Sequence, residues 1–276
     1  MIDASHLDSI YKAARIVLWV EDTCTRDYLR EAWKRTPDVA FFIAGGNEHI
    51  PRLVLATRRL NIGHVFGILD RDFGRSNRAK WNTADNFYLP RHEIENYLLD
   101  ADAFTASPFN NRSRSRSDVT TEMQRLANLQ PAWLACRHTM NIHGREATDR
   151  FLKSPKLVHI TDAPAAVSYI VTSKWFQQVV SRLASSLTVV ETSKRIDEAI
   201  AKFQTDLLTD DWIANFSGKE IFRQLRAYTY QPPQKPGNPD NDFAKSVGSW
   251  QAANDRVPPD IGDLLTALRT RVGIHP

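Results

Sequence analysis

The first hundred residues alternate between short apolar runs and stretches with helical spacing, and this alternation constrains the fold more than any other feature. Three runs are continuous and rich in β-branched and aromatic residues, which is typical of buried strands. They cover residues 14–20, 39–44 and 65–69, and a shorter run at 87–89 predicts a fourth strand. Buried strands that alternate with helices indicate a parallel sheet covered by helices on both faces. We therefore predict an α/β fold here.

Helical segments follow three of these strands. Residues 25–34 have an amphipathic pattern, and the next helix is expected over about 50–60, after a Gly-Gly turn. Asn47 is suited to cap that helix, because a short polar side chain can accept hydrogen bonds from the first free amides. A third helix is expected near residues 93–99, after the fourth strand.

The sequence changes character after about residue 100. The segment 110–117 is polar and basic and predicts a loop. Residues 119–216 have mainly helical spacing. Two short runs in this region could instead be strands: 156–160 and 187–190. The proline-rich segment 230–241 predicts another loop, and a last amphipathic helix is expected to begin at Pro258-Pro259.

Charge and cysteine content narrow the class of protein. The chain has 276 residues and a formal net charge of +4, a mild basic excess that favours an anionic partner. Its two cysteines can form neither a disulfide framework nor a zinc knuckle, which fits a reducing compartment. No apolar run is long enough to cross a bilayer, and the N-terminus does not resemble a signal peptide. We expect a cytoplasmic protein without a membrane segment.

Acidic side chains follow two of the predicted strands. Asp70 and Asp72 come directly after the third strand, and Glu21 follows the first. Residues two apart in an extended segment point to the same side, and α/β sheets bind ligands beyond the carboxyl ends of their strands. We therefore expect these three carboxylates to converge on a divalent cation, with Mg²⁺ or Mn²⁺ favoured by hard oxygen ligands. The simpler alternative is that both aspartates cap the next segment and lie in solvent.

Two glutamates near the fourth strand extend this acidic set. Glu93 and Glu95 open the third helix, where an acidic residue often interacts only with the helix dipole. The apolar residues Ile94 and Tyr97 indicate the buried face of this helix. From that pattern we expect Glu95 to turn toward the strand ends and Glu93 to be solvated. His92 lies beside them and could assist proton transfer.

Three motifs in this order resemble those of a topoisomerase–primase (TOPRIM) domain: Val17–Tyr28, Gly67–Phe73 and Glu93–Leu99. The sequence resembles the TOPRIM-like nuclease subunits of bacterial anti-phage defence systems such as PARIS. These are similar to the nuclease half of overcoming-lysogenization-defect (OLD) proteins. The resemblance implies a Mg²⁺- or Mn²⁺-dependent nuclease that cleaves RNA such as tRNA, or DNA. It also implies a separate ATPase partner protein and a homodimer.

The resemblance implies roles for individual residues. Four acidic residues match motif positions that bind metal and take part in catalysis: Glu21, Asp70, Asp72 and Glu95. Late in the chain, Phe216–Glu220 looks like the Gly-Lys element that returns to the site in OLD-type nucleases. In that role Lys219 would stabilise the charge of the transition state.

The resemblance also implies a division of the chain. Residues 1–105 would form the TOPRIM-like metal-binding core. A mainly helical insertion at 106–215 would make dimer or partner contacts. Residues 216–276 would form a C-terminal element that returns to the core.

Two positions depart from the family pattern. Asp22 stands where glycine is usual, and Thr25 stands where an aspartate is common. Asp22 or Asp27 could supply the missing carboxylate, so one-metal and two-metal chemistry both remain open. The departures also support an alternative, a catalytically inactive TOPRIM-like binding or sensor module. The sequence has no P-loop motif, so in either case the ATPase would be a partner.

Overall fold

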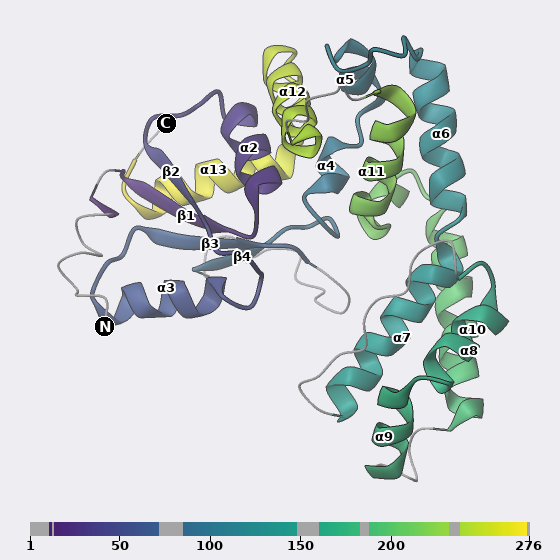
Figure 1. Cartoon of the computed structure of the whole chain (residues 1–276). Coiled ribbons are helices and arrows are strands. Elements are labelled where there is room, and N and C mark those ends of the chain that lie inside the picture. Colours follow the sequence, from purple (N-terminus) through teal and green to yellow (C-terminus); the bar gives the residue numbers. More distant parts are fainter. Residues whose placement is uncertain are drawn as a thin grey trace.

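The computed structural model describes residues 11–12, 14–71, 85–147, 160–182, 188–231 and 238–274, and it shows an α/β core beside a group of helices (Figure 1). The described residues form a parallel sheet in the order β2-β1-β3-β4. Its strands are β1 (Ile16–Val20), β2 (Val39–Ile43), β3 (Val65–Leu69) and β4 (Asn86–Tyr88). The predicted α/β class and parallel sheet are confirmed.

Helices cover both faces of the sheet (Figure 1). These helices are α2 (Thr23–Ala32), α3 (Ile50–Arg59) and α13 (Pro259–Arg271). A further helix, α12 (Pro239–Ala253), packs on α2. Alternate residues of β1 serve the two faces: Leu18 packs in the cluster that includes Tyr28 of α2, whereas Val17 packs on the opposite side. Gly67 of β3 allows α3 to approach closely, because a Cβ there would lie 2.3 Å from the side chain of Ile50.

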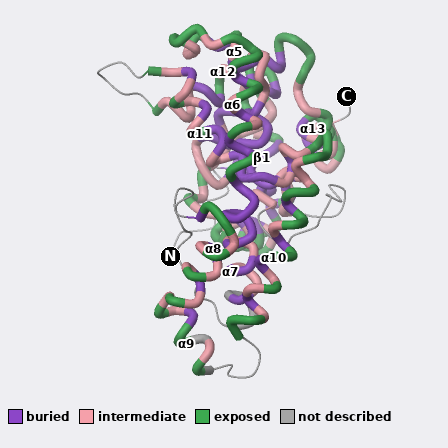
Figure 2. Tube along the Cα trace, turned by 90° about the vertical axis from the view of Figure 1, so that its right-hand side faces the viewer, coloured by how far each residue is buried: buried purple, intermediate pink, exposed green. Residues whose placement is uncertain are grey.

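A second group of helices connects the core to the rest of the chain. It consists of α4 (Glu95–Leu98), α5 (Ala101–Ala106), α6 (Arg116–Asn128), the 3₁₀ helix η2 (Trp212–Asn215) and α11 (Gly218–Thr229). The helical lobe consists of α7 (Pro131–Ala147), α8 (Ala163–Val171), α9 (Lys174–Arg182) and α10 (Val189–Asp206). One buried cluster extends from Leu18 in the sheet to Trp133 and Ile196 in the lobe, so these layers share a core (Figure 2).

Several helix boundaries differ from the predictions because local caps decide them. α2 begins at Thr23, since Asp22 accepts a hydrogen bond from the amide of Thr25 (2.9 Å). Asn47 was a wrong choice of cap, because the residue before α3 is His49, which makes no side-chain capping bond. Ser115 caps α6 through a reciprocal bond with Asp118, so the predicted loop 110–117 ends early.

Two further predictions concern segments that only partly overlap the described residues. The alternative that 187–190 is a strand is wrong for Val189 and Val190, which begin α10 after the cap Thr188. The predicted loop 230–241 is too long, because α12 begins at Pro239, where the fixed φ of proline suits a first helical turn. Residues 156–159, Leu187 and 232–237 lie outside the described parts of the chain.

Two aspartates hold the last helix of the core. Asp38, before β2, bonds to the guanidinium of Arg269 (3.1 and 3.2 Å), and Asp85, before β4, bonds to Arg271 (3.1 Å) and Arg58 (2.8 Å). The hydrogen bond from Arg269 lowers the pKa of Asp38, and that from Arg58 lowers the pKa of Asp85. These contacts tie α13 to the amino ends of two strands.

We expect Asp38→Asn to lower the free energy of unfolding by about 0.5–1 kcal/mol at neutral pH, since the pair is partly exposed. A carboxyl with a lowered folded pKa stabilises the fold above its ordinary pKa of about 3.9, and this contribution is lost as the pH falls through the folded value. The difference between variant and wild type should therefore shrink below about pH 3. Urea unfolding at neutral pH and below about pH 3 measures the difference in free energy of unfolding. An equal difference at the two pH values would contradict the stabilising role of the Asp38 carboxylate. Asp255→Asn is the control, because its pair with Lys34 is exposed.

None of the described helices combines the length and the apolar content that a bilayer crossing requires.

Candidate active site

The carboxyl ends of β1 and β3 open into a cavity of about 1060 Å³. Glu21 follows β1 and Asp70 follows β3, and both line this cavity together with Glu93 and Lys219. The topology therefore brings Lys219, almost 200 residues later in the chain than Glu21, to the same cavity. Asp72, which the motif resemblance also indicates as a metal ligand, lies outside the described residues.

Asp70 connects the end of β3 to the beginning of α4. Its Oδ1 accepts a hydrogen bond from the backbone amide of Ile94 (3.0 Å). The neighbouring Arg71 reaches another segment, where its Nη2 donates to the carbonyl of Ala214 (2.8 Å) and to Oδ1 of Asn215 (3.0 Å). These contacts fix the direction in which the chain leaves β3.

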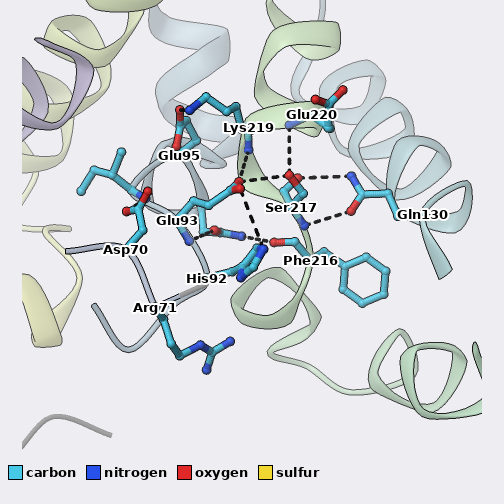
Figure 3. Close-up of polar contacts among 12 residues, drawn as sticks. Asp70, Arg71, His92, Glu93, Glu95, Gln130, Phe216, Ser217, Lys219 and Glu220 are labelled. Carbon is cyan, nitrogen blue, oxygen red and sulfur yellow. Dashed lines mark hydrogen bonds and ion pairs between the residues drawn. The ribbon is translucent and has the colours of Figure 1, made fainter. Parts of the chain in front are cut away.

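Glu95 lies buried in the first turn of α4 and faces Lys219. Its Oε1 is 3.8 Å from Nζ of Lys219, and its buried Oε2 has no hydrogen-bond partner among the described residues (Figure 3). Burial, reinforced by the negative charge of Glu93, raises the pKa of Glu95 to about 8. Burial alone would lower the pKa of Lys219, but the nearby carboxylates, Glu95 foremost, outweigh it and raise that pKa. The site therefore holds more negative charge than Lys219 alone compensates.

Glu93 is not solvated, so this prediction was wrong. Only 6% of the residue is exposed, and its Oε2 accepts hydrogen bonds from Oγ of Ser217 (3.0 Å) and from the backbone amide of Lys219 (2.8 Å). Burial alone would raise the pKa of Glu93. The positive charge of His92, whose Nε2 lies 3.8 Å from Oε1 of Glu93, and the hydrogen bond from the amide of Lys219 outweigh burial, so the pKa of Glu93 is lowered. Glu93 therefore holds the backbone that carries Lys219 (Figure 3).

Two side-chain amides, those of Asn96 and Gln130, also hold the backbone before Lys219, and neither residue was predicted to have a role. Asn96 donates to the carbonyl of Phe216 (2.8 Å) and accepts from the amide of Glu93 (2.7 Å). Gln130 forms hydrogen bonds with both backbone groups of Ser217, at 2.9 and 3.2 Å. Asn96 lies within the motif Glu93–Leu99, which was a usable signal, whereas Gln130 belongs to no motif. We call residues 216–219, held by these amides and Glu93, the lysine turn.

The two positions that depart from the family pattern form one local interaction. Oδ1 of Asp22 accepts hydrogen bonds from both the amide and the hydroxyl of Thr25, each at 2.9 Å. Asp27 is buried and pairs with Arg26 (2.7 Å) and Lys245 (3.5 Å), and it is not among the residues that line the cavity. Asp22 thus serves as a helix cap, and Asp27 is paired with cations outside the cavity.

Cys24 lies in the first turn of α2 and is buried. Burial, and then the charge of Glu95, raise the pKa of its thiol well above the ordinary value. A thiol held in its neutral form is a poor nucleophile. Cys24 therefore acts as packing beside the acidic residues.

The donors at this site suit a hard divalent cation. Glu21, Asp70 and Glu95 offer carboxylate oxygens, and the unpartnered Oε2 of Glu95 is a buried acceptor that a cation can satisfy. No three acidic, histidine or cysteine side chains among the described residues already lie close enough together to hold one ion. The chemistry of the donors therefore fits Mg²⁺ or Mn²⁺, while a complete ligand set would need Asp72 or a shift of the carboxylates.

Comparison with known proteins gives no family. No protein-family model matches the chain, and no curated protein matches its sequence.

Proposed function

We propose that the protein is a metal-dependent nuclease that hydrolyses phosphodiester bonds in RNA such as tRNA, or in DNA. One observation carries the proposal: a buried glutamate with an unpartnered oxygen, Glu95, lies 3.8 Å from Lys219, which lines the cavity together with Glu21 and Asp70. A cation could satisfy the unpartnered oxygen of Glu95, and the lysine beside it could bind a phosphate oxygen. The resemblance to TOPRIM-like nucleases supports an effector of a bacterial anti-phage defence system.

Four carboxylates would hold the metal: Glu21, Asp70, Asp72 and Glu95. When bound, Mg²⁺ or Mn²⁺ would polarise the phosphate and lower the pKa of a water molecule. Lys219 would neutralise a phosphate oxygen that gains charge as the bond to phosphorus breaks. Glu93 acts as a positioning residue, because it binds the backbone amide of Lys219. Glu95, protonated near neutral pH, would give up its proton when a cation arrives.

The partners in this proposal come from the resemblance. A separate ATPase would control the nuclease, and the mainly helical region 106–215 would form a homodimer or hold that ATPase. The mild positive charge of the chain suits a nucleic-acid substrate. We also propose a cytoplasmic location, which the reduced cysteines fit.

Nuclease assays with Asp70→Ala and Glu21→Ala test the proposal. We expect each variant to lose at least about 100-fold in the rate of cleavage of labelled RNA or DNA in Mg²⁺ or Mn²⁺, and EDTA to abolish cleavage by the wild type. Glu198→Ala, at an exposed position on α10, is the control that should keep full activity.

The proposed nuclease activity would be contradicted if the wild type, alone and with its ATPase partner, cleaved neither RNA nor DNA while both variants kept the biological activity. The alternative, an inactive TOPRIM-like binding or sensor module, would then explain the site. The capping bond between Asp22 and Thr25 gives the two sequence departures a structural reason, so they do not by themselves favour that alternative.

A further inference from the structure

The cavity at the strand ends extends to the helical lobe, and α10 forms part of its far wall. Four residues of α10 line it: Asp197, Ile200, Ala201 and Gln204. Their spacing of three, four and seven places them on one face of the helix. This face, which we call the α10 stripe, presents a polar group at each end and apolar side chains between them.

The α10 stripe is separate from the surface that packs the helix into the lobe. The packing face consists of Thr192, Ile196, Ala199 and Phe203, all of which are buried. Asp197 and Gln204 are exposed, and neither side chain makes a hydrogen bond or ion pair within the parts of the chain that the structure describes. Their hydrogen-bonding capacity is therefore directed to the cavity rather than to the fold.

The charges around the cavity select the part of a nucleic acid that can lie against the far wall. On the side of the helical lobe the charged lining residues are two acids, Asp162 and Asp197, and one cation, Arg137. A wall with this excess of negative charge disfavours phosphates. Carboxylate and amide side chains are, however, acceptors for the amino groups of cytosine, adenine and guanine. Nucleobases rather than phosphates fit the far wall.

Apolar residues supply the flat surface that a base needs. Leu129, which is 49% exposed, lies on the cavity together with Ile200 and Ala201. The guanidinium of Arg137, the cationic group on this wall, lies over the ring of Trp133 at 4.7 Å from the ring centre, so it packs against another residue of the lobe. A cavity of about 1060 Å³ is at the upper limit of small-molecule sites, which gives room for a short unpaired stretch.

We propose that the α10 stripe binds an unpaired nucleobase next to the phosphate that is cleaved. This inference rests on the proposed nuclease function and specifies its substrate as a single-stranded or looped segment. Bases within a duplex have their amino groups paired, so only an unpaired base can offer them to Asp197 and Gln204. Bases that carry an amino group should be preferred over uracil at this position.

Binding measurements test the inference without relying on cleavage. The probe is a fluorescein-labelled RNA strand of about 12 nucleotides in Ca²⁺, with the matching DNA strand and a set of strands that each contain one abasic site. We expect Asp197→Ala and Gln204→Ala to weaken binding of the intact strand about tenfold. One abasic position should weaken wild-type binding to a similar degree, and these variants should show no further loss with that strand. Glu198→Ala, on the other exposed face of α10, is the matched control and should bind like the wild type.

The outcomes separate the inference from the nuclease proposal. Three results would overturn the inference. The α10 stripe variants could bind as tightly as the control, their losses could add to those of the abasic strands, or the wild type could bind no strand. By coupling we mean that the α10 stripe variants show no further loss with the abasic strand. Cleavage by the wild type in Mg²⁺ or Mn²⁺ without this coupling would leave the nuclease proposal intact. Coupling without any cleavage would leave base binding intact and contradict the nuclease. A loss seen with RNA alone or with DNA alone identifies the substrate.

Discussion

Glu95→Gln is expected to lower cleavage at least about 100-fold while it stabilises the metal-free protein. Both effects follow from the buried carboxyl whose Oε2 has no partner and whose pKa is raised to about 8. An acid with a raised folded pKa contributes stability that is full below its unfolded pKa and is lost as the pH rises through the folded value. The wild type should therefore lose stability between about pH 4 and pH 8, and the glutamine variant should not lose this contribution.

Chemical unfolding in EDTA at pH 6 and pH 9 measures this effect. We expect the variant to exceed the wild type by about 2 kcal/mol at pH 9 and by about half as much at pH 6, because at pH 6 Glu95 is protonated in the folded protein but already ionised in the unfolded chain. Added Mn²⁺ should raise the stability of the wild type alone. Glu198→Gln controls for the loss of a surface charge. A glutamine variant that is less stable at pH 9, or one that cleaves normally, would contradict the role given to Glu95.

Gly218→Ala is expected to destabilise the fold by about 2–3 kcal/mol and to remove most of the activity. A Cβ at Gly218 would lie 2.4 Å from the backbone nitrogen of Asn96 and 2.8 Å from its side chain. A backbone atom cannot rotate away, so the lysine turn must separate from α4. Lys219 would then lose both the hydrogen bond to Glu93 and its position beside Glu95.

Gly262→Ala is the matched control, because it makes the same change inside α13 with no atom within 4 Å of the new methyl group. It should stabilise the protein by about 0.5–1 kcal/mol, since alanine favours a helix more than glycine does. Thermal unfolding and cleavage rates of both variants give the comparison. A Gly218→Ala protein with normal stability and normal activity would show that the close contact between the lysine turn and α4 is unimportant.

The parts of the fold that depend on local pattern were predictable. Val65–Leu69 was expected with its observed bounds, because a strand that is buried on both faces reads as a continuous apolar run. Lys219 was selected because the motif resemblance, rather than any periodicity, connected the end of the chain to the strand ends. α12 was missed because its buried residues include Gly248 and Gln251, which do not form an apolar stripe.

Glu93 shows why the rest could not be read from the sequence. The apolar positions around it suggested an exposed side chain, but its partners Ser217 and Lys219 are more than 120 residues away. Pattern analysis compares neighbours within a window and cannot reveal a hydrogen bond between distant segments. The same limit applies to Gln130 and to the α10 stripe, whose polar ends look like ordinary solvated residues.

The lysine turn also determines when the site can exist. The hydrogen bond from the backbone amide of Lys219 to Glu93 joins residues 126 positions apart, so the acidic residues emerge from the ribosome long before Lys219 does. A nascent chain with a folded sheet would therefore hold the carboxylates without the lysine. Contacts of such long range form late in folding. Assembly of the site therefore has to wait until synthesis has passed Lys219, so the order of translation sets the order in which its two parts become available.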